Sequence, residues 1–414
     1  MTHTVYRLLM WLLVPFALLR LALRARRQPG YLANVGERFG FYRQQPGKPV
    51  IWVHAVSVGE TRAAEPLIRE LIQRHGNKQI LLTNMTPTGR ETSRELFDDE
   101  VLHCYLPYDL GPAVERFLQR FRPEAAIVME TELWPTLVER CARHRIPTHL
   151  VNARLSARSA KRYSRFSTLT REMLGKLTLI CAQTDRDAER FRTLGATRLK
   201  VTGNLKFDRS PPQQQLALGN RLRDAFGSER RVFLAASTRE GEESLLLEVL
   251  KAMDVPALLT VIVPRHPQRF DEVARALDGA GLSYQRRSEN RPVELATQVV
   301  LGDSMGEMFA YYTASDVAFI GGSLLPLGGQ NLLEACAVGK PVVVGPHTFN
   351  FEEATEQAIE AGAALRVGDS GELASTVCGL LRDPARAEKI GQSGRAFMAM
   401  HRGATTRTLD AIGL

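Results

Sequence analysis

Several sequence patterns that identify common enzyme classes are missing from this chain. It contains no G-x-x-x-x-G-K-[ST] loop, so a P-loop nucleotide hydrolase is excluded. It also has no H-E-x-x-H motif and no cysteine and histidine cluster with zinc spacing. Long lysine and arginine runs and RNA-binding signatures are absent as well, so nothing favours a nucleic-acid partner. We therefore expect chemistry that needs no metal and no other cofactor.

Cysteine is scarce and odd in number. The chain has 5 cysteines, and no two of them form a C-x-x-C pair. Three of them lie in or beside apolar runs that resemble strands. This usage argues against structural disulfides and favours a reducing compartment.

The N-terminal apolar stretch is short for a membrane-spanning helix, which needs about 20 apolar residues. Residues 8–19 are uninterrupted apolar sequence that includes Pro15, and Arg7 and Arg20 flank them. The stretch 5–23 approaches spanning length if both arginine side chains extend toward the interface. No small-residue cleavage site follows, which argues against a removed signal peptide. A marginal span, an interfacial helix and a buried helix all remain open.

Basic residues follow this stretch directly. The chain has 54 lysines and arginines against 45 aspartates and glutamates, a net charge of +9. Arg20, Arg24, Arg26 and Arg27 lie at the end of the apolar stretch. Such a cluster favours an anionic membrane lipid as partner and places the rest of the chain on the cytoplasmic side. It also argues against a buried helix.

After the N-terminal segment, short apolar runs alternate with helical patterns. The runs are almost continuously apolar and end at turn or capping residues, which is typical of parallel sheets covered on both faces. The predicted strands are 50–56, 79–85, 101–106, 125–129, 148–152, 177–182 and 199–202 in the first half, and 232–236, 258–263, 299–301, 317–320 and 341–344 in the second.

The alternation is interrupted after Gly203 by a stretch with Pro211 and Pro212. We predict an N-terminal helix (1–27), a first Rossmann-like domain (28–208), a linker (209–230), a second Rossmann-like domain (231–385) and a C-terminal helix (386–414). Ligands of such doubly wound sheets bind outside the carboxyl ends of the strands. Two such domains facing each other would form a cleft with one substrate in each.

Candidate catalytic residues follow strands of the first half. Glu60 lies at the end of the first strand and in the first turn of a helix, where it could act as a general base. Ser57 and Glu60 also have the spacing of a capping box, a purely structural role. Glu130 and Glu132 end another strand and fit either a hydroxyl-rich acceptor or acid enrichment at a helix start.

Arg154 and Arg158 follow a third strand of the first half, where their guanidinium groups suit a phosphorylated acceptor. A solvated face is the alternative for both.

Four strand ends of the second half are polar or rich in glycine and suit a phosphate. They contain Ser237 and Thr238, Arg265 and His266, Met305 and Gly306, and the pair Gly321 and Gly322. Gly328–Gly329 then opens a predicted helix that carries Asn331 and Glu334 on one face. Glu334 could bind both hydroxyls of a ribose, or both residues could simply cap the helix.

Seven segments together resemble Kdo (3-deoxy-D-manno-octulosonic acid) transferases. They are WVHAVSVGE (52–60), METELWP (129–135), NARLSARS (152–159), TGNLKFD (202–208), PRHPQR (264–269), GDSMGEM (302–308) and the run that starts GGSLLPLGGQNLLE (321–351). With the N-terminal segment, the resemblance covers nearly the whole chain in order. It implies a two-domain GT-B glycosyltransferase fold and peripheral attachment to the inner membrane.

The resemblance also implies an activity and its residues. It implies a metal-independent, inverting transfer of Kdo from CMP-Kdo to a lipid A precursor such as lipid IVA, with Glu60 as the base. It assigns the CMP site to Arg265, His266, Met305, Gly306, Asn331 and Glu334. One motif departs from the family pattern GGHNPLE: Gln330 and Leu332 replace the histidine and the proline. Because glutamine carries no charge, an anion contact at position 330 is in doubt.

Two other functions remain open. A GT-B glycosyltransferase or an epimerase that uses a UDP-sugar would share the fold, although the N-terminal segment argues against a soluble epimerase. A membrane-tethered nucleotide-binding scaffold without catalysis would share the donor motifs. Glu60 at a strand end argues against the scaffold.

Overall fold

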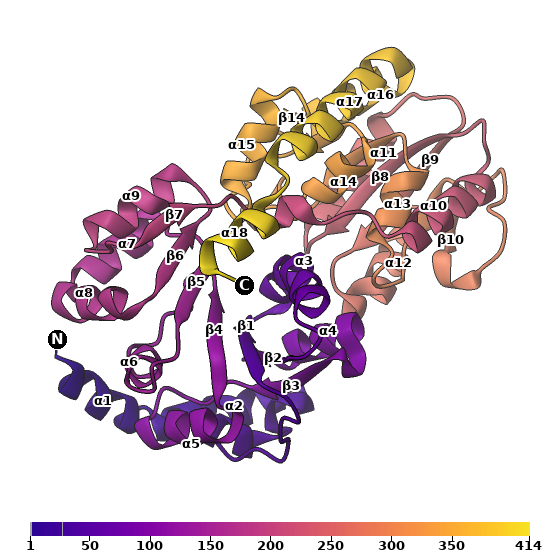
Figure 1. The fold of residues 1–414 in the computed structure, drawn as a ribbon. Coiled ribbons are helices and arrows are strands. Elements are labelled where there is room, and N and C mark those ends of the chain that lie inside the picture. Colours follow the sequence, from indigo (N-terminus) through magenta and orange to yellow (C-terminus); the bar gives the residue numbers. More distant parts are fainter. Residues whose placement is uncertain (1, 27) are drawn as a thin grey trace. The chain divides into compact units, whose positions relative to one another are not determined.

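The computed structural model describes residues 2–26 and 28–414. It divides into two compact units: Met1–Arg209 with His401–Leu414, and Ser210–Met400. Each unit contains a seven-stranded sheet in which the paired strands run parallel (Figure 1). The predicted α/β class with two parallel sheets is therefore confirmed.

The first sheet has the strand order β3-β2-β1-β4-β5-β6-β7. The order reverses direction between β1 and β4, so this pair marks the switch point at which doubly wound sheets bind ligands. Its strands are β1 (Val50–His54), β2 (Gln79–Asn84), β3 (Val101–Tyr105), β4 (Pro123–Met129), β5 (Thr148–Ala153), β6 (Leu179–Ala182) and β7 (Leu199–Val201).

Apolar residues cover both faces of the first sheet. In β1, Ile51 and Val53 pack against α3, and Val50 and Trp52 pack against α5. This alternation explains the continuous apolar run, since both faces are buried. The helices of this unit are α1 (His3–Leu12), α2 (Val14–Ala25), α3 (Val58–Arg74), α4 (Pro87–Phe97), α5 (Gly111–Phe121), α6 (Pro135–Arg143), α7 (Ala157–Ser164), α8 (Ser167–Lys176), α9 (Asp185–Thr193) and α18 (Ala404–Ile412).

The second sheet has the order β10-β11-β9-β8-β12-β13-β14, with its switch point between β8 and β12. Its strands are β8 (Arg231–Thr238), β9 (Leu258–Pro264), β10 (Tyr284–Arg286), β11 (Val299–Leu301), β12 (Val317–Ile320), β13 (Val342–Val344) and β14 (Ala364–Arg366). Its helices are α10 (Gln213–Phe226), α11 (Glu242–Ala252), α12 (Phe270–Gly279), α13 (Met308–Ala314), α14 (Leu333–Val338), α15 (Glu352–Glu360), α16 (Ser370–Arg382) and α17 (Pro384–His401).

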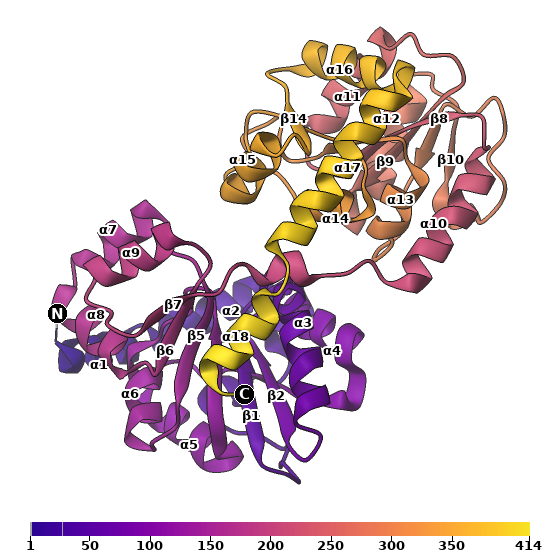
Figure 2. The same ribbon diagram turned by 45° about the horizontal axis from the view of Figure 1, so that its top comes forward.

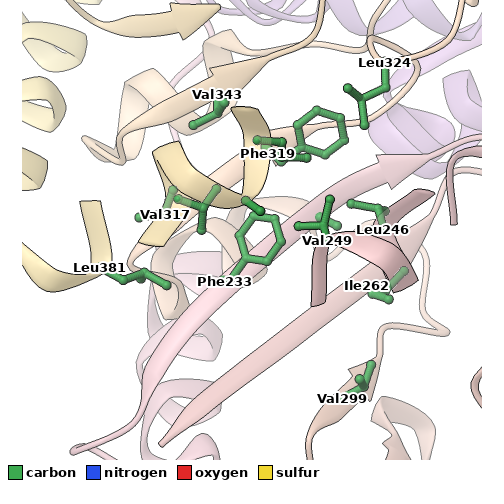
Figure 3. Close-up of a cluster of buried hydrophobic side chains, with 14 of the residues drawn as sticks. Phe233, Leu246, Val249, Ile262, Val299, Val317, Phe319, Leu324, Val343 and Leu381 are labelled. Atoms are coloured by element: carbon green, nitrogen blue, oxygen red, sulfur yellow. The ribbon is translucent and has the colours of Figure 1, made fainter. Parts of the chain in front are cut away.

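One face of the second sheet packs under α11, α12 and α16 (Figure 3). Phe233 and Phe319 lie in the centre of this core, and Leu246 of α11 and Leu381 of α16 belong to the same cluster. The core rigidly supports the strands whose carboxyl ends carry the predicted donor residues.

All twelve predicted strands are confirmed, with boundaries that shift by up to a few residues. Two strands were not predicted, β10 and β14. Both have three residues and lie at the edges of the second sheet, and their residues Gln285 and Arg366 are polar. An edge strand this short has no apolar run to reveal it.

The apolar N-terminal stretch is broken into two helices. Helices α1 and α2 meet at Leu13 with a bend of 44°. Pro15 lies in the first turn of α2, where its missing N–H and its ring prevent a continuous helix. In the described part of the chain, no single helix has the length and hydropathy to cross a membrane; only this bent pair meets both together. Arg27 of the predicted basic cluster lies outside the described residues.

Two predicted segments differ from the structure. The predicted linker at 209–230 contains the whole of α10, because its glutamine-rich sequence forms a helix after Pro212. The predicted C-terminal helix at 386–414 is two helices, since Gly403 adopts a left-handed φ of 88° between α17 and α18. Helix α18 returns to the first unit and packs beside α3 (Figure 2).

Candidate functional site

The switch point of the first sheet carries acidic residues on both of its strands. Glu60 follows β1 in the first turn of α3, and Glu130 follows β4 directly. Since β1 and β4 are neighbours in the sheet, both residues lie at the same edge (Figure 1). The charge of Glu130 disfavours ionisation of Glu60, as the pKa of Glu60 shows below.

Glu60 is bound to the loop between β1 and α3. Its carboxylate accepts the N–H of Val56 at 2.8 Å and the hydroxyl of Ser57 at 3.2 Å. The predicted capping box is not formed, because the Ser57 side chain makes no cap hydrogen bond to the helix backbone. The carboxylate is thus positioned by two hydrogen bonds and retains lone pairs for a further partner.

Burial raises the pKa of Glu60 to about 8, and the charges of Glu130 and Glu132 add to the rise. The hydrogen bonds from Val56 and Ser57 lower the pKa but do not cancel the burial. A base with a pKa near the working pH combines a usable ionised fraction with a strong drive to accept a proton. The side chain therefore has the electrostatic properties of a general base.

Glu130 has an unusual backbone conformation. Its φ of 54° lies in the left-handed region, and its N–H donates to the Val151 carbonyl at 2.9 Å. For a residue other than glycine, this conformation costs about 1 kcal/mol or more and is common at functional sites. Its carboxylate lies 3.6 Å from the ammonium of Lys206.

Lys206 was not among the predicted site residues. It lies in the segment TGNLKFD, but a single lysine after a short strand matches no sequence pattern that would indicate a functional residue. Only the fold brings it to Glu130, by way of η4 (Leu205–Asp208). There it balances one of the three acidic charges.

The other predicted acceptor residues have different environments. Glu132 is half-buried, and burial raises its pKa, with a further rise from Glu130. Arg154 is half-buried immediately after β5, and Arg158 is exposed in the first turn of α7. Glu130 and Glu132 therefore belong to the surroundings of Glu60, whereas no contact in the structure brings Arg158 to them.

The switch point of the second sheet is held together by close backbone approach. Gly321 after β12 allows this, because a Cβ at that position would lie 2.6 Å from the Cα of Thr238. Ser237 has a left-handed φ of 58° at the same point. The hydroxyl of Thr238 donates to Glu243 at 2.8 Å, so Thr238 is buried and already bonded.

Glu242 is a structural residue that the sequence did not single out. Its fully buried carboxylate accepts N–H groups from Arg239, Gly322 and Leu324. It thereby fixes the turn after β8 to the loop after β12. A glutamate that follows a glycine at a strand end is too common a pattern to reveal this role.

Arg265 and His266 follow β9, the neighbour of β8. The N–H of Arg265 donates to the Thr238 carbonyl at 3.0 Å, which fixes it beside the switch point. His266 is exposed, and its pKa is lowered by partial burial and by the charges of Arg265, Arg239 and Arg269. This strand end is therefore electropositive.

Met305 and Gly306 lie in the loop after β11. Met305 is exposed, and Gly306 has a left-handed φ of 78°, a conformation that favours glycine. The hydroxyl of Ser304 donates to Glu307 at 2.7 Å and closes the loop. The loop leaves the Met305 side chain free to contact a ligand.

Asn331 and Glu334 differ from the predicted arrangement on one helical face. Helix α14 begins at Leu333, so Asn331 precedes the helix and Glu334 lies in its first turn. Asn331 accepts the N–H of Leu333 at 3.1 Å, which is a capping role. Glu334 is half-buried, and its charge adds to the rise in the pKa of Tyr312 that burial causes.

Within the described residues, no three histidine, cysteine, aspartate or glutamate side chains are arranged to hold a metal ion. The cysteines Cys104, Cys141, Cys181, Cys336 and Cys378 are all free thiols.

Two family models match this chain in succession. The model described as 3-Deoxy-D-manno-octulosonic-acid transferase (kdotransferase) matches residues 33–209. The model described as Glycosyl transferases group 1 matches residues 233–397. The matches correspond to the two sheets, one for each.

Full-length relatives carry the same description. A 3-deoxy-D-manno-octulosonic acid transferase of Bordetella pertussis is 44% identical, over 100% of this chain and 99% of its own length. A protein of the same description from Haemophilus influenzae is 39% identical, over 98% of this chain and 97% of its own length. The crystal structure of a glycosyltransferase from Rickettsia africae has a TM-score of 0.60 at 14% identity, over 88% of this chain and 98% of its own. The likeness to that structure concerns the fold, and it agrees with the predicted GT-B class.

Proposed function

Because this chain belongs to the 3-deoxy-D-manno-octulosonic acid (Kdo) transferase family and is a glycosyltransferase, we propose that it transfers Kdo from CMP-Kdo to the lipid A precursor lipid IVA. The reaction belongs to the assembly of the lipopolysaccharide core. The observation that carries the proposal is Glu60, whose pKa is raised to about 8 at the switch point of the first sheet.

Glu60 acts as the general base of a direct displacement. It takes the proton from a glucosamine hydroxyl of the acceptor, and that oxygen bonds to the anomeric carbon of Kdo. The bond from this carbon to the CMP phosphate breaks, and CMP leaves with the electron pair. A single displacement inverts the anomeric configuration. General-base catalysis of this kind contributes about 100- to 10,000-fold.

The donor binds to the second unit. Arg265 and His266 lie at an electropositive strand end that suits the phosphate of CMP. The exposed side chain of Met305 and the open backbone at Gly306 suit the base and sugar of the nucleotide. Ser237, Thr238, Asn331 and Glu334 complete the proposed donor residues. Thr238 and Asn331 act mainly by shaping the backbone, since their side chains are already hydrogen-bonded.

The acceptor binds to the first unit. Glu130 and Glu132 accept hydrogen bonds from sugar hydroxyls near Glu60, and Arg154 and Arg158 meet phosphate groups of the lipid A precursor. Lys206 holds Glu130 in place through its ion pair. This arrangement is supported by the electrostatic influence of Glu130 and Glu132 on Glu60.

The chain attaches to the cytoplasmic face of the inner membrane through α1 and α2. The first unit holds α1 by polar contacts: the Tyr6 hydroxyl donates to Asp109 at 2.8 Å, and His3 lies 3.2 Å from Glu139. Apolar side chains such as Leu12 and Phe16 remain 76% and 62% exposed. A helix pair with its polar side on the protein and its apolar side exposed suits an anionic lipid interface.

The test is a transfer assay with purified protein, CMP-Kdo and tetraacylated lipid IVA, with a metal chelator present. We expect one or more Kdo additions by mass spectrometry. Glu60→Ala keeps CMP binding and loses turnover by at least about 100-fold. Near-normal turnover of Glu60→Ala removes it from the role of base.

A UDP-sugar enzyme is the outcome that this assay has to exclude. We expect CMP, and not UDP, to raise the temperature of thermal unfolding. Stabilisation by UDP alone, together with no Kdo transfer, would overturn the proposed donor.

A further inference from the structure

The backbone of Arg239 is fixed over the loop that follows β12. The same oxygen of Glu242 accepts the N–H of Arg239 at 3.0 Å and the N–H of Gly322 at 2.5 Å. These bonds use only backbone atoms of residue 239. The backbone position of residue 239 is therefore set by the fold, and a substitution at 239 leaves the bonds in place.

The side chains of Arg239 and Gln330 lie on the same side of Gly322. A Cβ built on Gly322 would lie 3.4 Å from Cγ of Arg239 and 3.4 Å from Nε2 of Gln330. Because both atoms lie 3.4 Å from the same point, Cγ of Arg239 and Nε2 of Gln330 are separated by at most twice 3.4 Å. Both side chains are half-buried, so each is partly accessible to a ligand at the surface of the loop.

Neither side chain has a partner among residues 2–26 and 28–414. The structure gives the Arg239 guanidinium no ion pair and no hydrogen bond, and it gives the Gln330 amide no hydrogen bond. The nearby acids are occupied: Glu242 binds three backbone N–H groups, and Glu243 binds Thr238 and Arg269. Arg239 is thus a half-buried cation without a counter-ion beside an amide donor.

We propose that the Arg239 guanidinium and the Gln330 amide form an anion subsite that binds the charged oxygens of the sugar-nucleotide donor. Two chemically similar groups can occupy it, the phosphate of the nucleotide or the carboxylate of the transferred sugar. The inference rests on the proposed function, which places the donor at this edge of the second sheet.

The chemistry of the two side chains fits this role. A guanidinium offers two parallel N–H groups that match the oxygens of a phosphate or a carboxylate, and the amide adds a third donor. Arg239 supplies, on the same side of Gly322, the charge that glutamine cannot carry.

The test measures binding of cytidine, CMP and CMP-Kdo to the full-length protein by calorimetry, with no acceptor present. Arg239→Gln is compared with the wild type, with Arg239→Lys and with Gln330→Ala. Arg386→Gln is the matched control, because Arg386 is exposed in α17 of the same unit. Thermal unfolding of each variant checks its fold.

We expect Arg239→Gln to weaken binding of the anionic ligand by about 10- to 100-fold. The affinity of Arg239→Lys should lie between those of the wild type and Arg239→Gln, since an ammonium keeps the charge but cannot form two parallel hydrogen bonds. Gln330→Ala should have a smaller effect, and Arg386→Gln none. If the phosphate is the bound group, the preference for CMP over cytidine falls. If the carboxylate is bound, the preference for CMP-Kdo over CMP falls.

Unchanged preferences in folded Arg239→Gln and Arg239→Lys overturn the anion subsite and leave the proposed function intact. Failure of the wild type to bind either CMP or CMP-Kdo overturns both. A loss equal for cytidine, CMP and CMP-Kdo also overturns the subsite, because it means that the substitution disturbs the loop rather than an anion contact.

Discussion

In the proposed function, Glu60 is a suitable general base because its ionised form is unfavourable in the folded chain. Its pKa of about 8 means that the base is mostly protonated at pH 6 and mostly ionised at pH 9. We predict that kcat/KM rises with pH, with its midpoint near pH 8, and levels off above about pH 9. A pH profile measured from 5.5 to 9.5 checks this. A flat profile over that range would contradict a base with a raised pKa.

Glu130 controls that pKa through its charge. Removing the charge with Glu130→Gln lowers the pKa of Glu60, so the rise in kcat/KM should move to lower pH. The shift is measured in the same pH profile. Glu70→Gln is the control, because Glu70 lies exposed on the same helix α3 and pairs with Arg74 instead. The midpoint should stay in place for Glu70→Gln.

The raised pKa of Glu60 also has a cost in stability. The folded state binds a proton at Glu60 more tightly than the unfolded state, so stability is lost as pH rises from the unfolded pKa, about 4.5, through 8. Glu60→Gln removes this loss. We predict that this variant gains stability over the wild type by about 1 kcal/mol or more at pH 9, with little gain at pH 4. Urea unfolding at both pH values measures the difference, and equal gains would be contrary to this account.

At the scale of elements, Glu242 joins the turn after β8 to the loop after β12. Glu242→Ala leaves three buried N–H groups without an acceptor, at about 1 kcal/mol or more each. We predict a loss of about 3–5 kcal/mol in the free energy of unfolding of the second unit, measured in urea. Glu240→Ala, a change at an exposed neighbour, should lose less than about 0.5 kcal/mol.

The helix pair α1 and α2 is the element that meets lipid in the proposed function. Replacing Leu12 and Phe16 by glutamate removes two exposed apolar side chains, each worth about 1.5–3 kcal/mol when buried in lipid. We predict that the double variant binds anionic vesicles at least about 100-fold more weakly in a sedimentation assay. Leu295→Glu is the control, since Leu295 is 91% exposed in the second unit. Equal loss with this control would indicate a general effect of charge.

At the scale of the whole molecule, the chain passes twice between the units, after Arg209 and before His401. Asp208 accepts the N–H groups of Gly403 and Thr405 and thereby holds the start of α18 on the first unit. We predict that Asp208→Ala frees α18, so that its amides lose protection from hydrogen exchange. Amides of α11 in the second unit should keep theirs. Equal protection of α18 in variant and wild type would show that the apolar contacts of Leu409 suffice.

The sequence alone determined the fold class, twelve of the strands and the family. Both faces of a parallel sheet are buried, so its strands appear as apolar runs that can be read locally, whereas the short polar edge strand β10 cannot. The strand ends that carry Glu60 and Arg265 could also be predicted from the sequence, because polar residues follow apolar runs there. Their roles in binding and catalysis stay predictions.

Only the tertiary structure decided which of these strand ends meet. The crossover order makes β1 the neighbour of β4, which brings Glu130 to Glu60, where its charge adds to the rise in pKa that burial causes. It also makes β8 the neighbour of β12, which brings the side chains of Arg239 and Gln330 to the same side of Gly322. Contacts between residues that are distant in the sequence leave no local sequence pattern, because they depend on the order in which the strands pack in the sheet.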